Sequence, residues 1–268
     1  MGKEESQMRI IECSKDSHLE CAEKIIAQNA SEPVSVAVEH HMDVFINERP
    51  AMRITCTPEH LDELVLGRLL TEGLIRQASD IEEIYICEKG LRAKVLVSRQ
   101  AEERMKEAQA VRVDTCCTDN KALLAGERNF MPVTPISWES DWLQKLAERM
   151  KSQEPLYSET HAVHACYLAM GDRLLCCRED IGRHNALDKV IGWAMAEKVE
   201  LSHCLLFTTG RMPADMVSKA IRAGVPLMAS KTYPTDQGIA LAKEANLTLV
   251  TVRPNGTMLI WNNGPDSD

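Results

Sequence analysis

The sequence has no long hydrophobic run. No apolar stretch approaches the roughly 20 residues that a membrane-spanning helix needs. The charged first 20 residues also lack the apolar core of a secretory signal. We therefore expect a cytoplasmic protein without a membrane partner.

The sequence also has no excess of basic charge. It contains 31 Lys and Arg residues against 40 Asp and Glu residues, which gives a formal net charge of -9. Proteins that bind nucleic acids usually carry a basic excess or a basic stripe, and no such stripe occurs here. Nucleic acid is therefore not an expected partner, although a few fixed cations could still form a local anion site.

A third absence concerns the cysteines. None of the ten stands in a C-x-x-C pair, so the spacing of a zinc knuckle or a dithiol redox motif is missing. A reducing compartment would keep these thiols free. Most of them lie in apolar surroundings, which is typical of small buried side chains. Cys116 and Cys117 differ, because they lie in a polar stretch where a thiolate could be exposed and reactive, or incidental.

The chain has the composition of a globular protein. It has 268 residues, of which 44% are hydrophobic, enough for one large domain or two modest ones. Apolar and polar residues follow one pattern in the first half of the chain and another in the second half. The pattern of the first half predicts strands over 34–39, 43–47 and 51–56, a helix opening at Thr57-Pro58-Glu59, and a hairpin about Lys89-Gly90. Residues 1–130 thus read as an α+β domain that ends in a loop over 113–125.

The second pattern begins after residue 130. A connecting helix over 138–151 and a hairpin about Gly171-Asp172 precede strands that alternate with helices. This alternation predicts a layered α/β domain over 131–268, with parallel strand pairings.

Polar residues gather at two predicted strand-to-helix junctions. In open α/β sheets, ligands bind at the carboxyl ends of strands, and free first-turn amides beside an arginine suit a phosphate. An ordinary turn and a capped helix, with Asn185 or Asp180 as the cap, are the alternatives. The residues concerned are Glu179, Asp180, Arg183, His184 and Asn185 at the first junction, and Gly210 and Arg211 at the second.

A metal site is a further hypothesis. His161 and His164 could bind a metal with Cys166 or Cys176, but their spacing matches no standard zinc set. A polar histidine near the ligand site is the alternative for His164.

Three segments carry a resemblance to a known family. EDIGRHNALDKVIG, THAVHACYL and TTGRMPADMVSKAIRAGVPLMASKTYPT resemble segments of the FdhD family of formate dehydrogenase accessory sulfurtransferases. The likeness extends over roughly residues 30–262. It implies a cytidine-deaminase-like α/β C-terminal domain with a smaller α+β domain, and a homodimer.

The resemblance also implies an activity. A loop cysteine, here Cys116, would take sulfur as a persulfide from a cysteine desulfurase and pass it to the molybdenum cofactor, in its bis-molybdopterin guanine dinucleotide form, for formate dehydrogenase. Guanine nucleotides would bind as analogues of this cofactor. The implied cofactor-binding residues are His164, Glu179, Asp180, Arg183, His184, Gly210, Arg211, Arg253, Pro254, Asn255 and Gly256.

The cysteine loop departs from the family pattern. C-G-x-C-G is usual, but this chain reads CCTDN, so Asp119 stands where the second cysteine would be and Cys117 replaces a glycine. One cysteine is sufficient to carry a persulfide. The alternative is a cofactor-binding chaperone that has lost transfer. A deaminase-type zinc hydrolase would need H-x-E and P-C-x-x-C motifs, and neither occurs.

Overall fold

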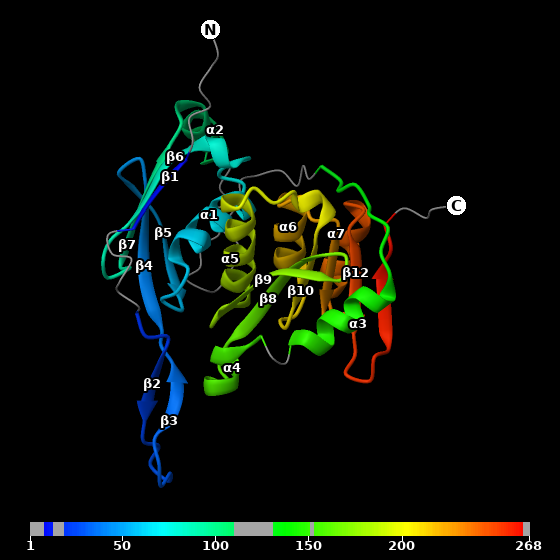
Figure 1. The fold of residues 1–268 in the computed structure, drawn as a ribbon. Coiled ribbons are helices and arrows are strands. Elements are labelled where there is room, and N and C mark those ends of the chain that lie inside the picture. The colour runs from blue at the N-terminus through cyan, green and yellow to red at the C-terminus, as the bar shows by residue number, and fades with distance from the viewer. Residues whose placement is uncertain (1–7, 13–18, 110–130, 151–152, 265–268) are drawn as a thin grey trace.

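The computed structural model describes residues 8–12, 19–109, 131–150 and 153–264. The predicted loop over 113–125, with Cys116, Cys117 and Asp119, lies outside the described residues. The described chain forms two sheets joined by helices, and a two-stranded arm that extends from the first sheet (Figure 1). The predicted mixed α/β class is therefore confirmed.

The N-terminal half contains a five-stranded sheet in the order β1-β6-β7-β4-β5. Strands β1 and β6 and strands β4 and β7 pair in parallel, and the other neighbours are antiparallel. The arm is the antiparallel pair β2 and β3. The elements are β1 (Arg9–Glu12), β2 (Ala22–Ile25), β3 (Val34–Ala37), β4 (His40–Ile46), β5 (Arg49–Cys56), α1 (Leu61–Thr71), a 3-10 turn (Ala78–Asp80), β6 (Ile81–Ile86), β7 (Arg92–Val97) and α2 (Arg99–Gln109).

The C-terminal half contains a six-stranded sheet in the order β13-β12-β11-β10-β8-β9, in which β10, β11 and β12 are parallel. Helices α5, α6 and α7 pack on one face, and α3 packs on the other. The elements are α3 (Ser140–Arg149), α4 (Pro155–Thr160), β8 (His164–Met170), β9 (Arg173–Asp180), α5 (Arg183–Ala196), a 3-10 turn (Leu201–His203), β10 (Leu205–Thr208), α6 (Ala214–Arg222), β11 (Leu227–Ser230), α7 (Asp236–Glu244), β12 (Thr248–Val252) and β13 (Met258–Asn262). The predicted layered α/β arrangement is confirmed.

Several local predictions are correct and a few are wrong. Gly90 and Gly171 occupy the two predicted hairpin turns with φ of +65° and +61°. Helix α1 begins at Leu61 and not at Thr57, because the hydroxyl and the backbone N–H of Thr57 both donate to Asp180. Strands β1 and β2 and helix α4 are not apparent in the sequence pattern.

Helices α1 and α5 join the two halves through a close backbone crossing. A Cβ built on Gly67 would lie 1.8 Å from the carbonyl oxygen of Asp188, and one built on Gly192 would lie 1.8 Å from that of Glu63. One hydrophobic cluster continues from the first half into the second across this crossing. The domain boundary at residue 130 stays a prediction.

A buried ionic cluster lies beside the crossing. Nζ of Lys219 on α6 donates to both carboxylate oxygens of Asp188, at 2.9 and 3.0 Å, and to Glu72 at 3.1 Å. Arg68 pairs with Glu72 at 3.1 Å and with Asp188 at 3.3 Å. Two cations and two carboxylates thus balance, which is what burial of charge requires.

Gly192→Ala is expected to destabilise the protein. Alanine normally favours a helix over glycine by up to about 1 kcal/mol, but the added methyl would meet the α1 backbone, which cannot yield as a side chain can. We expect the free energy of unfolding to fall by about 3 kcal/mol, as in an overpacked core. Urea denaturation measures this change, and a more stable variant would contradict the crossing.

Candidate functional site

The carboxyl edge of the C-terminal sheet is the candidate site. Strands β10, β11 and β12 run parallel and end together at this edge. Strand β8 runs antiparallel to β10, with Cys166 opposite Thr208, so β8 begins here. The predicted residues His164, Gly210 and Arg253 therefore come to one edge, from three different strands.

Gly210 lets the α5 N-terminus approach the loop after β10. Its backbone N–H donates to Thr208 Oγ1 at 3.1 Å, and its carbonyl accepts from Ser230 at 2.7 Å and Thr232 at 2.8 Å. A Cβ on Gly210 would lie only 2.9 Å from the Cβ of Arg183. The glycine is thus needed for close packing, because Arg183 occupies the space of a side chain.

Positive charge is concentrated at this edge. Burial lowers the pKa of His164, and the charges of Arg183, His184 and Arg211 lower it further. Nε of Arg183 is buried and has no hydrogen-bond partner among the described residues. Since an unpaired buried donor is costly, a bound acceptor would stabilise this arrangement.

The first turns of α5 and α6 meet at the same place. Their N-cap residues, Gly182 and Pro213, supply no side-chain cap. A helix N-terminus carries a partial positive charge and favours anions. The alternative that Asn185 or Asp180 caps α5 is wrong, because Gly182 is the N-cap residue and no side chain caps it. Asn185 lies inside the helix and donates to Thr55 and Asp180.

A cavity of about 490 Å³ opens between α4 and the ends of β8, β10 and β11. Lys231, at the end of β11, lies 3.5 Å from the buried Glu154. Neither Lys231 nor Thr232 was apparent as a site residue, although both follow a predicted strand. The cavity is lined by Glu154, Tyr157, His161, Ala162, Val163, His164, Ala165, Thr209, Lys231 and Thr232.

Glu179 and Asp180 support the walls of this site. Glu179 accepts from the backbone N–H groups of Leu156 at 2.9 Å and Tyr157 at 2.7 Å, so it holds the α4 N-terminus. Burial raises the pKa of Glu179, and these two hydrogen bonds lower it in part. Asp180 is fully buried and pairs with Lys189 at 2.7 Å. Direct contact of either carboxylate with a ligand stays a prediction.

The turn Arg253-Pro254-Asn255-Gly256 connects β12 to β13. Gly256 has φ of +79°, which explains the glycine, and Asn255 Oδ1 accepts from Thr257 N–H at 3.1 Å. Arg253 donates to the Tyr233 hydroxyl at 2.6 Å, and its guanidinium lies 5.7 Å from the Tyr233 ring centre. Tyr233 thus holds Arg253 at the rim of the site.

The metal hypothesis receives no support from these contacts. His161 packs edge-to-face on Tyr157, with ring centres 5.5 Å apart, and Cys166 is fully buried. Within the described ranges, no group of three or more His, Cys, Asp or Glu residues could hold a metal ion. None of the helices in these ranges combines the length and the hydrophobicity that a membrane span requires.

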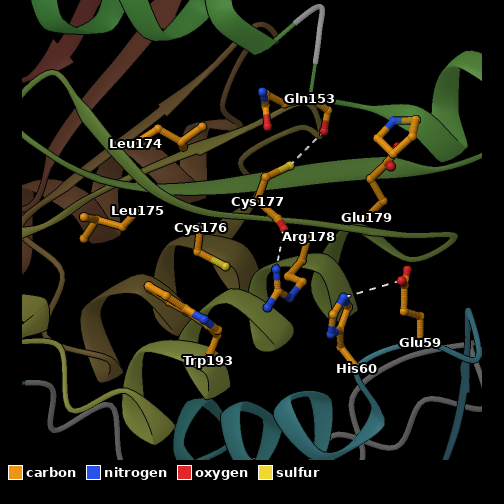
Figure 2. A pocket seen from close by; sticks show the side chains of 11 residues that line it. Glu59, His60, Gln153, Leu174, Leu175, Cys176, Cys177, Arg178, Glu179 and Trp193 are labelled. Atoms are coloured by element: carbon orange, nitrogen blue, oxygen red, sulfur yellow. Dashed lines mark hydrogen bonds and ion pairs between the residues drawn. The ribbon is translucent and has the colours of Figure 1, made fainter. Parts of the chain in front are cut away.

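A second cavity, of about 610 Å³, lies along the edge strand β9 and is lined in part by Cys176 and Cys177 (Figure 2). Cys177 donates to the carbonyl of Gln153 at 3.3 Å, and Cys176 points toward Trp193. Burial raises the pKa of each thiol to about 12. Because the thiolate is the nucleophile, these cysteines are poor candidates for collecting sulfur at neutral pH.

Comparison with known proteins identifies the family. The family model described as FdhD/NarQ matches residues 37–266, which is most of the chain. The chain belongs to the FdhD/NarQ family.

Relatives support the FdhD/NarQ assignment. A sulfur carrier protein FdhD from Geobacillus kaustophilus is 31% identical over 80% of this chain and 83% of its own. One from Listeria innocua is 29% identical over 81% and 85%. The crystal structure of a protein assigned as a formate dehydrogenase accessory protein, from Desulfotalea psychrophila, superposes with a TM-score of 0.72 at 28% identity, over 91% of this chain and 97% of that one.

Proposed function

We propose that this FdhD/NarQ protein is a persulfide carrier that delivers sulfur to the molybdenum cofactor for a formate dehydrogenase. The names of its relatives, sulfur carrier protein and formate dehydrogenase accessory protein, support the general role, which is to carry sulfur in connection with a formate dehydrogenase. The delivery of this sulfur to the molybdenum cofactor is supported by one observation: Arg183 and Arg211 lie beside His164 and His184 at the carboxyl edge of the C-terminal sheet.

The proposed ligand at this edge is the cofactor in its bis-molybdopterin guanine dinucleotide form. Its phosphates carry the negative charge that the arginines and the two helix N-termini favour. Gly210 lets Arg183 pack closely against the loop after β10, and Arg253 to Gly256 would border the ligand on the β12 side. A guanine nucleotide such as GDP offers the same phosphate and base chemistry as a probe.

Cys116 is the proposed carrier. Its thiolate would attack the terminal sulfur of a persulfide on a cysteine desulfurase, the donor sulfur–sulfur bond would break, and the donor cysteine would leave as a thiolate. We further propose that the protein works as a homodimer in the cytoplasm. The proposed partners act in succession: a cysteine desulfurase donates the sulfur, and the formate dehydrogenase then receives the cofactor.

The altered cysteine loop favours a second candidate function, a chaperone that binds and escorts the cofactor without transferring sulfur. Asp119 at the usual position of the second cysteine motivates it. Mass spectrometry of the wild-type protein after incubation with a desulfurase and cysteine distinguishes the two. We expect an added sulfur; its absence, with nucleotide binding intact, would favour the chaperone.

Arg183→Ala and Arg211→Ala are each expected to weaken GDP binding about ten-fold, because a charge-assisted contact contributes about 1.5–3 kcal/mol. Isothermal titration calorimetry measures the dissociation constant. Arg173→Ala is the matched control, since Arg173 is exposed at the opposite end of β9. Unchanged affinity in both site variants, with folding intact, would disprove the phosphate assignment.

A further inference from the structure

His184 and Asp215 form a side-chain pair that joins the first turns of α5 and α6. Nε2 of His184 lies 2.9 Å from Oδ2 of Asp215. The other carboxylate oxygen, Oδ1, accepts a 2.8 Å hydrogen bond from the backbone N–H of Met216. Because the carboxylate is held at both oxygens, its direction toward the imidazole does not depend on a ligand.

The pair has a defined hydrogen position. Burial by itself would raise the pKa of Asp215, but the hydrogen bond and charge of His184, with Met216 N–H and Arg183, lower it. An ionised carboxylate can only accept, so Nε2 of His184 carries the hydrogen. The other ring nitrogen, Nδ1, has no protein partner in the described part of the chain, and 24% of the side chain is exposed.

Charges from several elements act on this pair. Asp215 of α6 is the carboxylate paired with His184, and Arg183 of α5 and Arg68 of α1 also act on this carboxylate. His164 of β8 lies at the same edge, where the charges of His184 and of Arg211, after β10, act on it. A bound phosphate would add negative charge on the open side of His184, and a nearby negative charge favours the charged form of an imidazole.

We propose that His184 takes up a proton at Nδ1 when the site binds a phosphate group, and that Asp215 is the positioning residue for this uptake. The proton comes from the buffer, and no covalent bond between heavy atoms changes. The resulting imidazolium donates Nε2–H to Asp215 and Nδ1–H to the phosphate. This inference rests on the proposed function, since it takes the ligand to be a phosphate-bearing nucleotide.

Calorimetry with GDP measures the uptake directly. The titration is run at pH 7.5 in Tris and in PIPES, which differ in enthalpy of protonation, and the slope of the binding enthalpy gives the number of protons bound. The terminal phosphate is largely ionised at this pH, since its second pKa is about 6. We expect wild-type protein to take up between about half a proton and one proton, because a single histidine can accept no more than one.

Asp215→Asn is expected to reduce the uptake to near zero and to weaken GDP binding about ten-fold, the loss of one charge-assisted hydrogen bond. This direction is diagnostic, because removing a negative charge beside an anion site would otherwise strengthen binding. Asp236→Asn is the matched control, since Asp236 is also an acidic residue in the first turn of a helix, α7. It should bind as tightly as wild type or more tightly, with unchanged uptake.

His184→Gln distinguishes the residue that takes up the proton from the residue that positions it. This variant should abolish the proton uptake whether or not Asp215 is present. Normal GDP binding without proton uptake in wild type would overturn this inference and leave the proposed function standing. Tighter binding by Asp215→Asn would also overturn it. If wild-type protein does not bind GDP at all, the proposed function itself fails.

Discussion

Lys189→Met is expected to lower the free energy of unfolding by about 3–5 kcal/mol, the cost of leaving one partner of a buried ion pair uncompensated. Nζ of Lys189 and the carboxylate of Asp180 are both fully buried and lie 2.7 Å apart. Lys189 also donates to Thr57 Oγ1 at 2.7 Å and to the carbonyl of Glu179 at 3.3 Å. The variant would therefore loosen the contact between the two halves as well as the strand that precedes α5.

Urea denaturation of Lys189→Met measures this loss, and Lys243→Met on the exposed end of α7 is the control. The double variant Asp180→Asn, Lys189→Met should recover part of the stability, because it removes the unpaired charge. A loss below about 1 kcal/mol in the single variant, the range of surface pairs, would show that the Lys189–Asp180 pair does not stabilise the fold as a buried ion pair should.

Cys116→Ala is expected to abolish persulfide loading, whereas Cys117→Ala should load almost normally. Cys116 holds the family's first cysteine position, and one thiolate is enough to attack a donor persulfide. Asp119→Ala should load faster, because the carboxylate would raise the pKa of a neighbouring thiol by like-charge repulsion. Loading should also be faster in mild base than at neutral pH.

Mass spectrometry after incubation with a desulfurase reports the loading of each variant. Cys177→Ala serves as a control, because burial raises the pKa of that thiol to about 12 and it should not compete for sulfur. Full loading of Cys116→Ala would move the carrier role to Cys117 or another thiol. Failure of all variants to load, including the wild type, would favour the chaperone.

The place of the candidate site in the fold could be predicted, because several of its residues follow strand ends. Gly210, Arg211 and Arg253 come after β10 and β12, and parallel strands end at a common edge whatever their order in the sheet. The family motifs identified the same segments. Lys231 and Thr232 obey the same rule after β11, and reading every predicted strand end in this way would have found them.

The roles of individual carboxylates were not predictable. Glu179, Asp180 and Asp215 all lie near the site, yet each binds a different protein group: the α4 N-terminus, the Lys189–Thr57 cluster and His184. Helix α4 itself is a short segment without an apolar period. Its position depends on Glu179, a partner 23 residues away along the chain.

Local sequence thus accounts for the strands, the hairpin turns and the class of site, since periodicity and strand ends act over a few residues. Tertiary structure alone decided which charges remain available to a ligand. Thr57 was predicted to begin a helix, but it binds Asp180, 123 residues away. Such pairings depend on burial and on the crossing of α1 and α5, where two glycines let the backbones meet, and neither is encoded in a local pattern.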